Sequence, residues 1–322
     1  MIERLPLLAW PRGPERFLTT LIYHRVMPQP DPLRPGEADA ATFSRHMAFL
    51  ARHFKVLPLL DAVEQLREGR LPARACCITF DDGYADNLTV AQPILERHRL
   101  PATVFVATGY LDGGRMFNDS VIEIVARTAS PLLDFRSLGM DRYPIAGIEE
   151  KRAAVSALQN HLKYLPPVER DRLVGAMAES AGCGPLPQDL MLTTDQVGEL
   201  SRRGVEIGGH TDTHAILNTL DDDGARAEIG RGKSLLEQMT GRPVRAFAYP
   251  NGRPERDYSS RHVALMKEVG FEAAVTTAYG VANSNTDVYQ LPRFTPWGRA
   301  TTLLAARMTR NAMLRQPAAV CA

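Results

Sequence analysis

The sequence predicts an α/β fold: an incomplete, distorted barrel of parallel strands of the (β/α)7 type, with helices around it and one helical insertion. Short apolar runs rich in β-branched residues alternate with segments of helical periodicity, which is typical of a parallel sheet. The alternation gives six or seven strands, a count that fits an incomplete barrel better than an open sheet. Polar residues follow these strands at several places, and the carboxyl ends of the strands are where such barrels carry their chemistry.

The first third of the chain supplies three of the strands. They are predicted over residues 19–28, 76–80 and 102–108. Helices are predicted between and after them, over residues 41–54, 59–69 and 86–101. The run at 76–80 is expected to be buried on both faces, and it ends at two adjacent carboxylates, Asp81 and Asp82.

The alternation breaks between about residues 112 and 190. This segment has helical periodicity and many charges, but it lacks β-branched runs. We therefore expect a helical insertion packed on one end of the barrel, beside its mouth, where it could cover a substrate.

Strands and helices alternate again after the insertion. Strands are predicted over residues 205–214, 244–252 and 271–280, and helices over residues 193–204, 223–241 and 259–270. The predicted barrel domain covers residues 19–300, interrupted by the insertion, and residues 301–322 form a C-terminal helix or tail.

Charge and cysteine content narrow the class of protein. The 38 Lys and Arg residues nearly balance the 37 Asp and Glu residues, which argues against binding nucleic acid or a membrane surface through bulk charge. The four cysteines form no CxxC pair, so reduced thiols are expected. The apolar piece from Leu5 to Trp10 is too short for a signal peptide or a membrane span. We expect a cytoplasmic protein with at most peripheral membrane contact through that piece.

Two groups of residues carry candidate chemistry. Asp81 and Asp82 repel each other, so they need a cation, a shared proton or water; a solvated turn is the alternative. His210 and His214 lie four residues apart, after the residues VEI (205–207) that begin a predicted strand, and on a helix or tight loop this spacing lets both rings share one metal ion. With one carboxylate they would form a two-histidine, one-carboxylate site that leaves positions open for water and substrate. Zn²⁺ is the first choice, and Ni²⁺, Co²⁺ and Fe²⁺ suit the same ligands.

Three motifs carry a resemblance to a known family. The stretches TFDDG (79–83), HTDTH (210–214) and FAYPNG (247–252) resemble the polysaccharide deacetylase family, also called the NodB-homology or carbohydrate esterase 4 family. Its members remove N-acetyl groups from amino sugars. The resemblance spans roughly residues 20–110 and 190–296. YHRV (23–26) is similar to the subgroup that includes poly-N-acetylglucosamine deacetylases.

The resemblance implies a role for each residue of the motifs. Asp82, His210 and His214 would be the metal ligands, and Asp81 the general base. His24 would be the general acid that protonates the leaving amine. The oxyanion would be held by the metal and by a backbone N–H of the turn Tyr249-Pro250-Asn251.

The sequence departs from the family pattern at Ala248. Many members carry there an arginine that pairs with the catalytic aspartate, so another cation should take its place. Arg293, after the last predicted strand, is the candidate, and a surface arginine is the alternative. The other histidines lie on predicted charged helices and are expected to be structural: His46, His53, His98, His161 and His262.

Three functions fit these residues. The first is a metal-dependent N-deacetylase acting on an N-acetylhexosamine unit of a saccharide or a glycolipid, such as a lipid-linked glycan intermediate. The second is a deformylase, or an amidase or imidase, acting on another small amide. The third is a non-catalytic carbohydrate-binding protein. Against it stands the joint retention of Asp81, Asp82, His210, His214 and His24.

Overall fold

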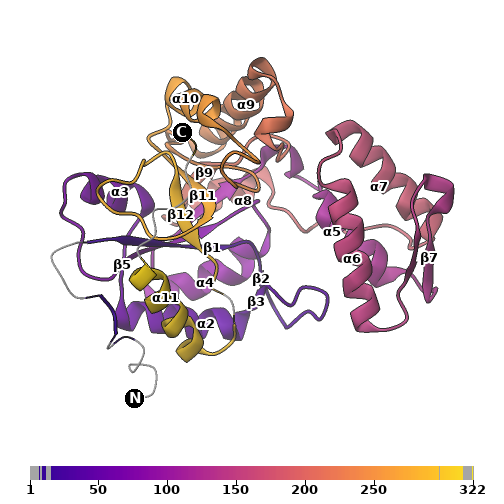
Figure 1. The fold of residues 1–322 in the computed structure, drawn as a ribbon, viewed down its shortest axis with the longest axis horizontal. Helices are drawn as coiled ribbons and strands as arrows, with labels where there is room; N and C mark the ends of the chain where they lie inside the picture. The colour runs from indigo at the N-terminus through magenta and orange to yellow at the C-terminus, as the bar shows by residue number, and fades with distance from the viewer. Residues whose placement is uncertain (1–6, 8, 12–15, 297, 315–320, 322) are drawn as a thin grey trace.

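Seven parallel strands form a closed ring at the centre of the molecule (Figure 1). The computed structural model describes residues 7, 9–11, 16–296, 298–314 and 321, and every structural statement refers to these. Each strand of the ring pairs with the next in chain order, and the last pairs with the first. The strands are β1 (Leu18–Tyr23), β5 (Ala75–Phe80), β6 (Thr103–Val106), β9 (Glu206–Gly209), β10 (Ala246–Ala248), β11 (Ala273–Tyr279) and β12 (Leu291–Phe294). The predicted barrel is confirmed.

The pairing of β1 with β5 sets up the site. Every residue of both strands is buried, which explains their largely apolar sequences, LTTLIY and ACCITF. Tyr23 lies opposite Phe80 at the carboxyl ends of the two strands. The next residues, His24 and Asp81, therefore emerge side by side at the mouth of the barrel.

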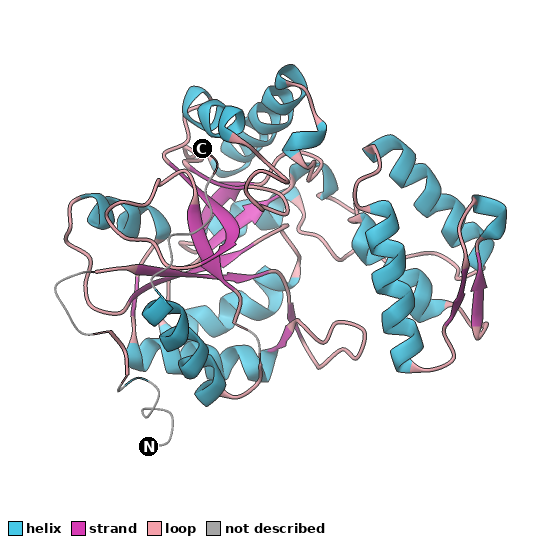
Figure 2. Cartoon of the chain, in the orientation of Figure 1, coloured by secondary structure: helices cyan, strands magenta, loops and turns pink. Residues whose placement is uncertain are grey.

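Helices cover the outside of the ring (Figure 2). They are α2 (Ala40–His53), α3 (Leu59–Arg67), α4 (Gln92–His98), α8 (Thr194–Arg202), α9 (Asp222–Thr240), α10 (Ser260–Glu268) and α11 (Thr301–Leu314). The largest core lies between these helices and the strands, where Phe43 and Met47 of α2 share one cluster with Phe80 of β5. Three two-residue strands complete the barrel domain: β2 (Val26–Met27), β3 (Ala38–Asp39) and β4 (Lys55–Val56).

The insertion forms a separate group of elements at one side of the barrel (Figure 1). It contains α5 (Phe117–Arg127), β7 (Leu132–Asp134), β8 (Arg142–Pro144), α6 (Ile148–Leu162) and α7 (Pro167–Ala181). It has its own core, in which Phe135, Leu158 and Met177 are fully buried. The chain enters it after β6 and leaves it before α8, so both connections lie on the side of the barrel where the strands end.

Several elements differ from the prediction. The strands predicted over residues 19–28, 205–214 and 244–252 end earlier, at Tyr23, Gly209 and Ala248. Arg293 lies inside β12 and not after the last strand, because the run LPRF pairs with both β1 and β11 although proline and arginine interrupt its apolar pattern. The hairpin of β7 and β8 was not predicted within the insertion. The helix predicted over residues 86–101 begins as a π-helix, Asn87–Ala91, and ends with α4 at His98.

The N-terminal apolar piece is partly described. Leu7 and Trp10 are buried, and the Trp10 ring contacts the rings of Phe17 and Phe54. These two side chains are therefore not exposed for the membrane contact predicted over residues 5–10, of which residues 5, 6 and 8 lie outside the described part. Among the described helices, none has both the length and the apolar character needed to cross a bilayer.

Candidate active site

Asp81 and Asp82 stand where β5 gives way to a tight turn. The Asp81 N–H donates to the Tyr23 carbonyl at 3.0 Å and extends the pairing of β5 with β1 by one residue. Asp82 then adopts a left-handed backbone with φ of 78°, and Gly83 follows with φ of 86°. A Cβ at Gly83 would lie 2.9 Å from a methyl carbon of Val106, so this position needs glycine. The strained backbone at Asp82 is typical of a functional site.

His210 and His214 are carried by a loop and not by a helix. Thr211 and His214 have left-handed backbones, with φ of 61° and 53°, which folds the loop back on itself. The two imidazole centres are 4.8 Å apart. The Nδ1 atom of His210 lies 2.7 Å from the Ala248 carbonyl, and a nitrogen in that position must carry the proton. In the neutral form of His210 the Nε2 atom then carries no proton, and its lone pair is free to bind a metal ion.

Asp82, His210 and His214 have the geometry of a metal centre. The Oδ1 atom of Asp82 lies 3.3 Å from Nε2 of His210 and 3.4 Å from Nε2 of His214. Donors bound to one ion at about 2.1 Å are roughly 3.0–3.4 Å apart at octahedral or tetrahedral angles. A carboxylate oxygen and an unprotonated ring nitrogen repel at this distance unless a cation lies between them. The three residues therefore fit a divalent ion.

Burial and charge act together on the acid and base chemistry of these groups. Burial lowers the pKa of His214 to about 4, and the neighbouring His210 acts in the same direction. Burial alone would raise the pKa of Asp82, but in the metal-free site the imidazoles of His210, His214 and His24, when protonated, outweigh burial and hold this pKa well below its usual range. Near neutral pH the site thus offers a neutral His214 and an ionised Asp82, the forms that bind metal ions.

Arg293 forms a two-pronged ion pair with Asp81. Its Nη1 and Nη2 atoms each lie 2.6 Å from one oxygen of the carboxylate, and its Nε donates to the Thr276 carbonyl at 2.7 Å. Both side chains are almost fully buried. Burial alone would raise the pKa of Asp81, but the charge and hydrogen bonds of Arg293 outweigh it, so the pKa falls below its usual value. The guanidinium predicted to substitute for the missing arginine at Ala248 thus contacts the predicted base.

His24 lies at the same mouth, half-buried, next to Asp81. Burial by itself would lower the pKa of His24, but the negative charges of Asp82, Glu37 and Asp81 outweigh burial and raise it above its usual value. A protonated imidazole in this position is suited to donate a proton.

The turn after β10 offers one backbone donor. The Tyr249 N–H donates to the Val275 carbonyl at 3.2 Å, and Pro250 has no N–H. The Asn251 N–H has no hydrogen bond within the described part of the chain, and Asn251 has a left-handed backbone with φ of 59°. The Tyr249 ring is buried and stacks on Tyr258 at 3.9 Å, so its side chain is structural.

Glu228 of α9 is a supporting residue that the sequence did not reveal. Its carboxylate accepts hydrogen bonds from the N–H groups of Asp212 and Thr213, at 3.0 and 2.8 Å, and from the Thr213 hydroxyl at 2.8 Å. It thereby fixes the loop between the two histidine ligands. A glutamate on a helix with many charges gives no signal that could have singled it out.

One charged side chain of the insertion acts on the site electrostatically. Arg170 of α7 is buried, its guanidinium lies 4.5 Å from the centre of the Phe117 ring, and its charge is among the causes that lower the pKa of His214. The other histidines were predicted to be structural, and two of them, His46 and His262, are fully buried. Their helices are amphipathic, and the two rings face the core.

Comparison with known proteins assigns the family. The profile of the polysaccharide deacetylase family matches residues 68–141 and 169–274. The chain belongs to this family, as its motifs predicted. A poly-beta-1,6-N-acetyl-D-glucosamine N-deacetylase of Staphylococcus aureus is 22% identical over 210 residues, which cover 64% of this chain and 71% of the relative. The Bacillus subtilis protein YxkH is 22% identical over 278 residues, covering 86% and 70%.

Two solved structures share the fold. The Streptococcus pyogenes deacetylase PplD, in complex with acetate, superposes with a TM-score of 0.59 at 18% identity, covering 94% of this chain and 98% of that one. IcaB from Ammonifex degensii gives a TM-score of 0.56 at 18% identity, covering 91% and 97%.

Proposed function

We propose that this protein is a metal-dependent N-deacetylase acting on an N-acetylhexosamine unit of a saccharide or glycolipid. The observation that carries the proposal is the cluster of Asp82, His210 and His214, whose donor atoms lie within 4.8 Å of one another. Directly beside it lies a second carboxylate, Asp81, which Arg293 keeps ionised. Membership of the polysaccharide deacetylase family supports an acylated amino sugar as the substrate.

Each residue has one task in this reaction. A divalent ion, when bound, would polarise the amide carbonyl and make water more acidic. Asp81 accepts the proton of the attacking water, because Arg293 fixes its orientation and its charge. The Asn251 N–H stabilises the negative charge that develops on the carbonyl oxygen. His24 protonates the nitrogen of the amine, which leaves poorly as an anion.

The relatives suggest the first substrate to test. The Staphylococcus aureus relative is named for poly-beta-1,6-N-acetyl-D-glucosamine, so we propose a β-1,6-linked N-acetylglucosamine oligomer. The structure of PplD is a complex with acetate, the product expected from an N-acetyl group. A lipid-linked glycan as the natural substrate, Zn²⁺ as the native ion and the cytoplasmic location stay predictions.

The test is acid release by the purified protein loaded with Zn²⁺. Incubation with the oligomer should release acetate and leave free amines, and the Asp82→Ala variant should release none. Formate from an N-formyl sugar, with no acetate from the oligomer, would favour the deformylase. Binding of the oligomer without release of either acid would favour the carbohydrate-binding protein.

A further inference from the structure

The backbone after His24 is held by side chains, because β1 has already ended at Tyr23. The His24 carbonyl accepts a hydrogen bond from the side-chain amide of Asn87 at 2.9 Å. The N–H of Val26 donates to the carboxylate of Asp86 at 3.0 Å. Asn87 and Asp86 thus hold the His24 carbonyl and the Val26 N–H between the end of β1 and the short pairing of β2 with β3.

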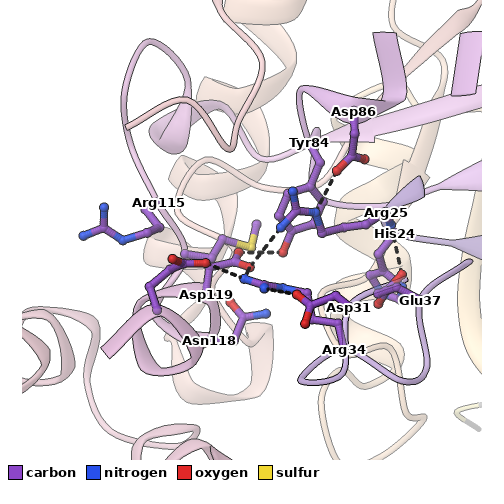
Figure 3. A network of polar contacts seen from close by, with 12 residues as sticks. His24, Arg25, Asp31, Arg34, Glu37, Tyr84, Asp86, Arg115, Asn118 and Asp119 are labelled. Carbon is purple, nitrogen blue, oxygen red and sulfur yellow. Dashed lines mark hydrogen bonds and ion pairs between the residues drawn. The ribbon is translucent and has the colours of Figure 1, made fainter. Parts of the chain in front are cut away.

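Asp86 holds the segment a second time through Arg25 (Figure 3). Its other carboxylate oxygen accepts a hydrogen bond from Nε of Arg25 at 2.8 Å. The Arg25 N–H donates to Glu37 at 3.1 Å, and its guanidinium lies 4.8 Å from the centre of the Tyr84 ring. Arg25, Tyr84 and Asp86 are all buried, so these contacts lie in a medium where charged hydrogen bonds are strong.

Asp86 and Asn87 belong to the same stretch as the two catalytic-site aspartates. After Gly83 the chain pairs with the end of the insertion, where the Ala85 N–H donates to the Leu190 carbonyl at 2.9 Å. The π-helix then begins at Asn87. Residues 81–87 therefore contain the proposed base, one proposed metal ligand and two of the groups that hold the backbone beside His24.

We propose that Asp86 and Asn87 are positioning residues for His24. They orient its imidazole toward the leaving amine while touching neither the substrate nor the metal ligands. The inference rests on the proposed function, because a proton donor is needed only where an amine must leave. A donor must lie within hydrogen-bond reach of that nitrogen, and a displacement of about 1 Å can lower a rate roughly 10²-fold.

The first experiment compares an amide with an ester, because an ester with a good leaving group needs no proton donor. Asp86→Asn and Asn87→Ala should lower kcat for the β-1,6-linked N-acetylglucosamine oligomer by about 10–100-fold. The KM and the bound Zn²⁺ should stay unchanged, and hydrolysis of 4-nitrophenyl acetate should fall less than about threefold. An equal loss on amide and ester would overturn the proposal.

A double-mutant cycle tests whether the effect passes through His24. In a His24→Ala background, Asp86→Asn should change amide hydrolysis by less than about threefold, because the group that it positions is already gone. Full additivity of the two effects would overturn the proposal. Asp39→Asn is the matched control and should leave amide hydrolysis unchanged. Asp39 is as buried as Asp86, and it accepts a hydrogen bond from the Thr42 N–H at the start of α2, as an asparagine can.

A structural readout separates this inference from the proposed function. Side-chain NMR of the histidines should show the His24 signal shifted or broadened in Asp86→Asn, with those of His210 and His214 unchanged. A wild-type protein that hydrolyses neither substrate would count against the proposed function, while an unmoved His24 signal would count against positioning. If Asp86→Asn does not fold, Asn87→Ala carries both measurements.

Discussion

The pair of Arg293 and Asp81 joins two residues that are 212 positions apart in the sequence. Many family members place the arginine at the position of Ala248, whereas here a guanidinium from β12 contacts the same carboxylate with two hydrogen bonds. Ala248 ends β10 and Arg293 lies in β12. Both strands belong to the barrel, so an arginine on either one can approach Asp81. The base keeps its charge although the position of the cation has changed.

Removal of this arginine should impair the base. In Arg293→Ala the buried Asp81 loses its cation, so its pKa should rise. The base must be ionised, and the acid limb of the kcat profile should therefore move to higher pH, with kcat about 10²–10³-fold lower near neutrality. Metal content should not change. Adding Ala248→Arg to the Arg293→Ala variant should restore part of the rate. An acid limb that does not move in Arg293→Ala would contradict the role of Arg293 in keeping Asp81 ionised.

His46 should make the fold sensitive to acid. Burial lowers its pKa to about 4 from the usual 6.5, and its ring contacts the Tyr23 hydroxyl at 3.2 Å and the Gly298 carbonyl at 3.1 Å. As the pH falls, His46 therefore binds a proton in the unfolded chain before it does so in the folded protein. The contribution of His46 to the free energy of unfolding is complete above pH 6.5 and is lost as the pH falls toward 4. His46→Gln should reduce this loss by up to roughly 3 kcal/mol.

Urea unfolding at pH 7 and at pH 4.5 measures the difference. The exposed His161, replaced by glutamine in the same way, is the control. An identical loss of stability in the wild type and in His46→Gln would show that other groups dominate the acid response.

At the scale of elements, prediction succeeded where burial and periodicity agreed. β1 and β5 are buried on both faces, so their apolar runs identified them directly. β12 was missed because its sequence, LPRF, contains the arginine that the site requires. The β7–β8 hairpin was missed because each strand has only three residues, too few to show an alternation.

The anchoring of the insertion can be tested through Arg34. Its guanidinium contacts Asp31, Asp119 and Glu123, the last two on α5 (Figure 3). Removal of one partner from a buried ionic network costs about 3–5 kcal/mol. Arg34→Ala should therefore speed amide exchange in α5 by at least roughly 10²-fold.

The barrel strands should keep their exchange rates in that variant, and bound Zn²⁺ should not change. Arg136→Ala, which breaks an exposed pair with Asp134 in the hairpin, is the matched control and should have little effect. Unchanged exchange in α5 of Arg34→Ala would mean that the insertion is held chiefly by its other contacts.

At the scale of the whole molecule, metal binding should stabilise the fold. An ion that binds only the folded protein, at 100 times its Kd, adds about 2.7 kcal/mol, which corresponds to roughly 5 °C in Tm. Chelation should remove this gain. Asp82→Ala, His210→Ala and His214→Ala should show no gain with Zn²⁺, whereas Asp81→Asn should keep it and lose 10²–10⁴-fold in kcat. Equal loss of metal in the two aspartate variants would mean that their roles are wrongly divided.

The site was predictable in its parts and less so in its assembly. Each motif is local, so the ligand types and the adjacent aspartates could be recognised from short stretches. The contact between Asp81 and Arg293 joins distant parts of the chain, and resemblance to the family suggested that a cation was missing without showing how another would reach the carboxylate. The supports of the site, Glu228, Asp86 and Asn87, act through backbone groups, and no spacing rule reveals such contacts.

The pairing between β9 and β10 is the shortest in the ring, because Phe247 opposite Gly209 is its single residue pair. The His210 ring adds one hydrogen bond to the Ala248 carbonyl. The connection between these strands includes α9 and then an exposed turn at residues 241–243. A cut there would leave the three ligands, the base and the acid on the first fragment, and Arg293 and the Asn251 N–H on the second. Two fragments that are inactive alone should regain hydrolysis only when fused binding partners bring them together, which would make this protein a split-enzyme reporter of proximity.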